Sequence, residues 1–188
     1  MAQFEGLLAL TNLASIGPVT QTHICKGETI KMFEHLIFSD NTLIRRAATE
    51  LVCNLMYEPS VFERYVKSDN SSRLQLIVAL SDCEDFETRR AASGILAILS
   101  SSEDGLRLLS KEPRFFPVLS TLLQDESIEI LHRSFETLKN CLIHIRQDIP
   151  QDLLTTAQQP ILDQIQMNSS LKPLSLELKS QITNTLNH

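Results

Sequence analysis

The sequence predicts an all-α protein that folds as a right-handed α-solenoid of about three and a half repeats with a C-terminal helical cap. Three observations support this prediction. A helical apolar stripe recurs every 42 to 44 residues, a period typical of stacked helical repeats. Val, Ile and Thr seldom alternate with polar residues, as they would in a half-buried strand. With 188 residues, 43% of them hydrophobic, the chain is long enough to bury a core.

The stripe predicts four long helices. It is clearest in LIRRAATELVCNLM, Leu43 to Met56, where the apolar residues share one helical face. The pattern returns 44 residues later in TRRAASGILAIL, which starts at Thr88. It also precedes this segment in FEGLLALTNLAS, from Phe4, and ends in ILHRSFETLKNCLIH, from Ile130. Small residues within the stripe should let a neighbouring helix approach closely; they are Gly6, Ala48 and Ala92.

Shorter helices fill the intervals between the long ones. MFEHLIFSDN, LQLIVALSDCED and FFPVLSTLLQDES each end in residues that can cap the following long helix. The candidate caps are Asp40 or Asn41, Asp82 or Asp85, and Asp125 or Ser127. PSVFERYVKSD and SSEDGLRLLSKEP each contain a further short helix, bracketed by proline and polar residues. A unit of three helices with this period favours the armadillo type of solenoid.

The two ends of the chain depart from the repeat. At the start, Phe4 enters a long helix without the two shorter helices that precede the others. Because an array needs a polar outer face at each end, we expect the chain to be the C-terminal part of a longer array. Residues 1–188 then form a single domain, with repeats in 1–149 and capping helices in 150–188. DLLTTAQQ, PILDQIQM and LKPLSLELKSQITNTL predict three helices in this cap.

Composition favours a protein partner over other ligands. The formal charge of -6 disfavours binding to a nucleic-acid backbone, and no stretch of about 18 apolar residues predicts a membrane span. The four cysteines form no C-x-x-C pair, so we expect reduced thiols in a cytoplasmic protein, with no metal and no cofactor. His23 lies near Cys25 but lacks an orienting third group, so the sequence predicts no enzyme.

Three blocks together resemble the C-terminal armadillo region of the UCS-type myosin chaperones. They are FEGLLALTNLAS, LIRRAATELVCNLM and DCEDFETRRAASGILAIL, and the resemblance is good over about Phe4 to Ser102 and weaker to about Ile145. It implies a cytosolic, ATP-independent chaperone module that holds the myosin motor domain and cooperates with the heat-shock chaperone machinery. The alternative is a general armadillo scaffold or adaptor for another cytosolic protein.

Likeness to armadillo arrays also nominates binding residues on a concave face formed by the long helices. Asn12 and Asn54 stand one repeat apart in the setting where such arrays bond a peptide backbone, although either amide can equally bond a neighbouring helix. Glu50 lies one turn before Asn54 and can add a negative charge to the groove.

Two arginines complete the candidate site. Arg45 and Arg46 lie in the first turn of a helix, where the helix dipole disfavours positive charge. We expect an acid in the preceding turn to brace them, such as Asp40, and the same for Arg89 and Arg90 with Asp82 or Glu84. Direct contact with a ligand is the alternative.

Overall fold

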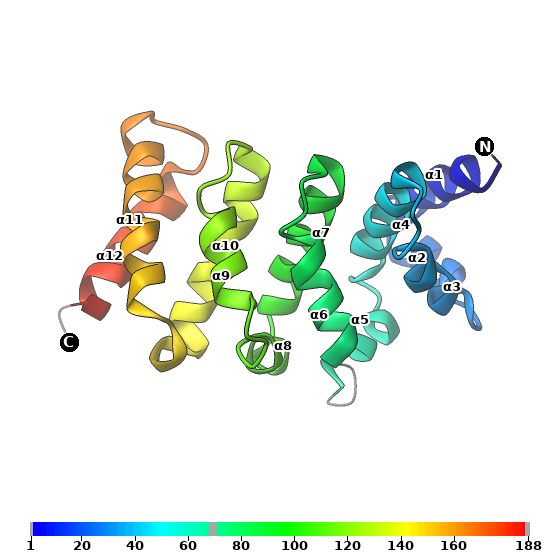
Figure 1. The fold of residues 1–188 in the computed structure, drawn as a ribbon, viewed down its shortest axis with the longest axis horizontal. Coiled ribbons are helices and arrows are strands. Elements are labelled where there is room, and N and C mark those ends of the chain that lie inside the picture. Colours follow the sequence, from blue (N-terminus) through cyan, green and yellow to red (C-terminus); the bar gives the residue numbers. More distant parts are fainter. Residues whose placement is uncertain (1, 68–70, 187–188) are drawn as a thin grey trace.

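The computed structural model describes residues 2–67 and 71–186, which form a row of stacked helical units with the two ends of the chain at opposite ends of the row (Figure 1). All regular secondary structure in these residues is helical, in agreement with the predicted fold class. The helices are α1 (Ala2–Ala14), α2 (Pro18–Ile24), α3 (Thr29–Leu36), α4 (Thr42–Leu55), α5 (Pro59–Val66), α6 (Ser71–Leu80), α7 (Phe86–Ser100), α8 (Glu103–Leu109), α9 (Phe115–Leu122), α10 (Ile128–His144), the 3-10 helix η1 (Arg146–Asp148), α11 (Gln151–Gln166) and α12 (Lys172–Leu186).

Three complete units repeat the order of two short helices followed by a long one. They are α2–α3–α4, α5–α6–α7 and α8–α9–α10, and α1 is the long helix that precedes them. Asn41, Asp85 and Ser127 are the N-caps of α4, α7 and α10, so in each predicted pair of cap residues the second caps the helix. Each side chain accepts hydrogen bonds from amides in the first turn, which would otherwise lack partners.

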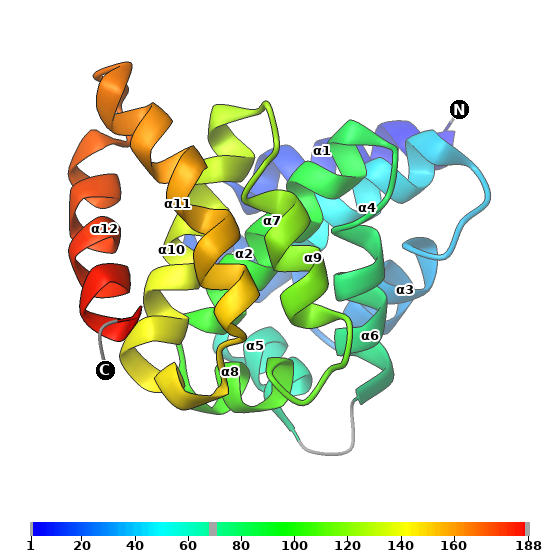
Figure 2. The same ribbon diagram turned by 60° about the vertical axis from the view of Figure 1, so that its left-hand side comes forward.

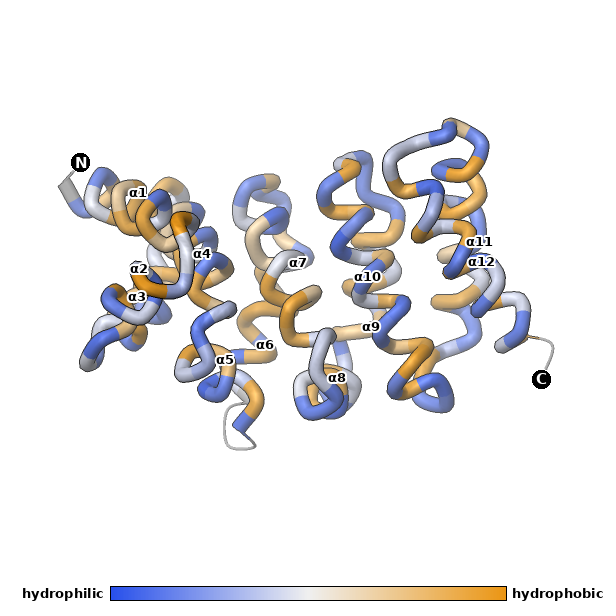
Figure 3. The backbone as a smooth tube through the Cα atoms, turned by 180° about the vertical axis from the view of Figure 1, so that it is seen from behind, coloured by the Kyte–Doolittle hydropathy of each residue, from blue (hydrophilic) through white to orange (hydrophobic). Residues whose placement is uncertain are grey.

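One apolar core runs through the units because each long helix packs on the next: α1 on α4, α4 on α7, and α7 on α10. Figure 3 shows the corresponding alternation of apolar stretches and polar turns along the chain. Leu51 and Ile95 occupy equivalent positions in two units and are both fully buried. The repetition therefore turns several small apolar faces into one extended core.

Small residues allow close packing in two of the three predicted places. Ala48 and Ala92 are fully buried between helices. Gly6 is exposed, with no atom within 4 Å of where a Cβ would stand, because no helix among the described residues packs on this side of α1. The tight contact that the prediction missed is at Gly94, where a Cβ would lie 2.7 Å from Cys53 Sγ.

The C-terminal region contains two long helices where three were predicted. α11 continues through Pro160, because buried Ala157 and Ile161 keep the apolar stripe unbroken on both sides of the proline. Figure 2 shows α11 and α12 side by side at this end. α11 packs on α9 and α12 on α10, so the stacking of the repeats persists after their sequence pattern is lost.

Candidate binding face of the long helices

The successive long helices α1, α4, α7 and α10 form one surface, which we call the long-helix face. Asn12 and Asn54 lie on α1 and α4 but have different surroundings. Asn12 is exposed, whereas Asn54 is half-buried and donates from Nδ2 to the backbone oxygen of Thr11 at 3.2 Å. The Asn54 amide thus ties α4 to α1, the second of the two roles open to it.

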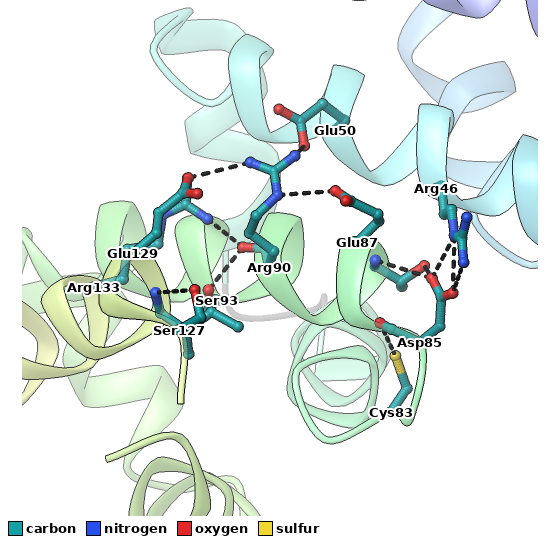
Figure 4. A network of polar contacts seen from close by, with 12 residues as sticks. Arg46, Glu50, Cys83, Asp85, Glu87, Arg90, Ser93, Ser127, Glu129 and Arg133 are labelled. Carbon is teal, nitrogen blue, oxygen red and sulfur yellow. Dashed lines mark hydrogen bonds and ion pairs between the residues drawn. The ribbon is translucent and has the colours of Figure 1, made fainter. Parts of the chain in front are cut away.

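Glu50 belongs to an ion-pair network centred on Arg90 (Figure 4). Arg90 of α7 contacts Glu50 of α4 at 2.7 Å, Glu87 in its own helix at 3.0 Å and Glu129 of α10 at 3.2 Å. Arg133 contacts Glu129 at 2.6 Å and also donates to the backbone oxygen of Arg90. One guanidinium therefore links three successive long helices.

The arginines at the start of the long helices are braced, but not by the acids that were expected. Arg46 donates from Nε to both carboxylate oxygens of Asp85, at 2.8 and 3.0 Å, and Asp85 lies in the next unit. Arg89 likewise donates to Asp125 of the next unit at 2.9 Å. The preceding turn contributes backbone oxygens, since Arg45 donates to Ser39 O at 3.0 Å. A guanidinium at the start of one long helix reaches the following unit, which spacing in the sequence does not reveal.

Two hollows open on the long-helix face. The first hollow has a volume of about 230 Å³ and lies over α1 and α4. Its lining is Phe4, Leu8, Thr11, Leu43, Arg46, Ala47, Glu50, Glu87 and Arg90. The second hollow, of about 560 Å³, lies where α4 and α7 end. Its lining is Met56, Tyr57, Pro59, Phe62, Ala97, Ile98, Ser101, Glu136 and Asn140.

The sequence analysis placed Glu50 and Arg46 in this region but missed the apolar part of both hollows. Leu8 and Leu43 are 42% and 47% exposed, and Tyr57 is 71% exposed. The signal available in the sequence was that Leu43 and Tyr57 fall outside the buried stripe of their helix. Exposed apolar side chains beside charged ones are typical of surfaces that bind proteins.

Comparison with known proteins identifies the family. No family model matches the chain. Ring assembly protein 3 of Schizosaccharomyces pombe is 32% identical over 192 residues, covering 99% of this chain and 26% of that protein. Protein unc-45 homolog B of Xenopus laevis is 33% identical over 162 residues, covering 85% of this chain and 17% of that protein. The chain belongs to the UCS family.

Solved structures agree with the fold of this UCS chain. UNC-45 from Drosophila melanogaster matches with a TM-score of 0.78 and 24% identity, over 98% of this chain and 23% of that one. An UNC-45 chaperone studied for binding and folding muscle myosin gives 0.76 and 23%, over 98% and 20%. Designed armadillo repeat proteins for modular peptide recognition give 0.75 and 17%, over 96% and 74%. The UCS chain is thus an armadillo-type solenoid that spans about a quarter of its fission-yeast relative.

The thiols of the UCS chain lie in environments that keep them protonated. All four cysteines are free, as predicted. Partial burial and the nearby charge of Glu58 raise the pKa of Cys25 to about 11, and burial raises that of Cys53 to about 12. The His23 Nδ1 is 2.7 Å from the backbone oxygen of Val19. A neutral thiol is a weak nucleophile, so Cys25 and His23 are not arranged as an activated pair.

Metal sites and membrane spans were also sought. Within residues 2–67 and 71–186, no group of three or more His, Cys, Asp or Glu side chains is placed to hold a metal ion. In the same residues, none of the helices combines the length and the apolar character that crossing a bilayer requires.

Proposed function

We propose that this UCS chain is a protein-binding chaperone module that assists the folding, assembly or stability of a myosin motor domain, and that it binds the motor through the long-helix face. Membership of a family of myosin chaperones carries the proposal. The two hollows support the choice of face, because they combine exposed apolar side chains with charged groups over adjacent long helices.

The surface chemistry fits a client that is partly unfolded. Such a client exposes apolar side chains together with backbone and charged groups. Leu8 and Leu43 of the first hollow, and Tyr57 of the second, offer apolar contact area. Glu50 and Arg90 at the rim of the first hollow are already paired with each other, which limits the cost of removing water from them when a client binds.

The family resemblance adds a cellular setting to the proposal. It places the module in the cytoplasm, where it works beside the heat-shock chaperone machinery. The residues that face the motor under this proposal include Asn12, Glu50 and Arg46, which lie on or beside the long-helix face, while Arg45 and Asn54 position the helices that carry them.

Heat-induced aggregation of a purified cytosolic myosin motor domain tests the proposal. Light scattering is followed with the chain, with full-length Ring assembly protein 3 as a positive control, and with a Leu8→Ser/Leu43→Ser variant. We expect the chain to suppress aggregation and the variant to suppress it less. If the chain binds other partly unfolded proteins equally well but not the motor, the chaperone assignment gives way to a general armadillo scaffold.

A further inference from the structure

We propose that the second hollow selects a client segment in which a bulky apolar side chain stands next to a lysine or arginine. This inference rests on the proposed function, because it specifies which part of a client the long-helix face contacts. It depends on three properties of the hollow: an apolar floor, hydrogen-bond acceptors at the rim, and a negative charge balance.

The floor of the second hollow is apolar and partly aromatic. Tyr57 is 71% exposed, and Phe62 and Ile98 are half-buried beside it in the lining. Tyr57 follows the end of α4, Phe62 lies in α5 and Ile98 in α7, so the floor is built from two successive units. A bulky apolar side chain would bury area against all three, and an aromatic ring also attracts a neighbouring cation.

The rim supplies acceptors rather than donors. α4 and α7 both end here, and the carboxyl end of a helix carries a partial negative charge that favours cations. Asn140 donates from Nδ2 to Ser100 Oγ at 3.0 Å, and its Oδ1 has no donor within the described part of the chain. Glu136 contributes a carboxylate that is 37% exposed. These groups complement a donor-rich cation and leave a client carboxylate without a partner.

The charge around Glu136 remains negative after its ion pairs are counted. Lys139 lies 3.1 Å from Glu136 and 3.8 Å from Glu177, so one ammonium is shared by two carboxylates and the three groups sum to one negative charge. The first hollow differs, because Arg46 and Arg90 at its rim balance Glu50 and Glu87. Only the second hollow should therefore distinguish a basic client segment from an acidic one.

Four synthetic peptides provide the test. Each is a Gly/Ser-rich octapeptide with a central pair of residues: phenylalanine–arginine, phenylalanine–glutamate, serine–arginine or serine–glutamate. Binding of the 188-residue chain to each immobilised peptide is measured by biolayer interferometry. The variants are Tyr57→Ala and Glu136→Gln. The matched controls are Phe38→Ala, an aromatic 65% exposed elsewhere, and Glu103→Gln, an exposed carboxylate in α8. Thermal midpoints confirm that each variant is folded.

We expect the phenylalanine–arginine peptide to bind about tenfold more tightly than the other three, which corresponds to the loss of one good contact. Tyr57→Ala should weaken its binding, and Glu136→Gln should abolish the preference for arginine over glutamate, while both controls bind like the wild-type chain. Equal binding of all four peptides, or a preference that survives both variants, overturns the inference.

Parallel measurement with the myosin motor domain separates this inference from the proposed function. If the motor binds the long-helix face and the peptides show no preference, the inference fails and the proposed function stands. If the peptide preference is found and the motor does not bind, the proposed function fails and the second hollow stands as a site for basic, apolar segments.

Discussion

Arg46 of α4 grips Asp85, the N-cap of α7, by donating from Nε to both carboxylate oxygens at 2.8 and 3.0 Å. The same carboxylate accepts from the backbone N of Thr88 at 3.1 Å and from its Oγ1 at 2.6 Å. One side chain thus joins two successive units and starts the long helix of the second. Its two roles can be separated by mutation.

Asp85→Asn should destabilise the chain less than Asp85→Ala. Asparagine retains an oxygen that can cap α7 but loses the charge that pairs with Arg46, whereas alanine loses both, and a lost cap costs about 1 kcal/mol. Urea unfolding at pH 7 measures the free energy of unfolding of each variant. Equal losses in the two variants would mean that the cap contributes nothing.

Acid should reduce the effect of Asp85→Asn. The hydrogen bonds from Arg46 and Thr88 hold the pKa of Asp85 well below its usual range in the folded chain. A lowered folded pKa contributes stability that is fully present above the unfolded pKa of about 3.9 and is lost as the pH falls from there toward the folded pKa. The thermal midpoints of wild type and Asp85→Asn should therefore differ by a constant amount from pH 7 to about 5 and converge below about 4. A constant difference throughout would contradict this.

Leu51→Ala and Ile95→Ala should each lower the free energy of unfolding by about 2 to 5 kcal/mol, because both side chains are fully buried between helices and leave a cavity. Leu176→Ala, at a position 49% exposed, is the control. Chemical denaturation measures all three. A loss below about 0.5 kcal/mol for either buried leucine or isoleucine is the size of a surface effect and would mean that the stripe is assigned to the wrong face.

Gly94→Ala should cost about 1 to 3 kcal/mol through overpacking. Its new Cβ would lie 2.7 Å from Cys53 Sγ and 3.3 Å from Arg133 Cζ, between three long helices. Gly6→Ala is the matched change in an exposed helical position with open space, where alanine should stabilise by up to about 1 kcal/mol. Thermal unfolding compares them, and a stabilising Gly94→Ala would show that α4, α7 and α10 are less tightly packed than described.

Asn54→Ala should lower stability by about 0.5 to 1.5 kcal/mol, because its hydrogen bond to Thr11 O is lost. Asn12→Ala removes an exposed amide and should leave the thermal midpoint unchanged. If Asn12 contacts a client, Asn12→Ala alone weakens binding to the motor domain. A lower midpoint for Asn12→Ala, or none for Asn54→Ala, would reverse these roles.

The fold follows from the sequence because its determinants are local and periodic. The stripe through Leu51 and Ile95 and the caps at Asn41 and Asp85 repeat with the unit, so each helix could be placed before its neighbours were known. Pro160 misled the prediction because tertiary packing around Ile161 outweighs the local tendency of proline to end a helix.

The site was less predictable because it depends on what adjacent units bring together. Arg46 was expected to pair within its own unit, yet its partner Asp85 is 39 residues away in the next one. The second hollow joins Tyr57, Ile98 and Asn140 from three different segments, and nothing in the spacing of these residues indicates that they share a surface.

Binding of the chain to a purified cytosolic myosin motor domain, measured beside three variants, tests the central claim most directly. Leu8→Ser/Leu43→Ser and Tyr57→Ala alter the two hollows, and Phe38→Ala alters an exposed aromatic elsewhere. We predict that the wild-type chain and Phe38→Ala bind the motor with the same affinity, and that both hollow variants bind more weakly with unchanged thermal midpoints. Equal binding by all four proteins, or none by the wild-type chain while full-length Ring assembly protein 3 binds, would contradict the claim that the long-helix face holds the motor.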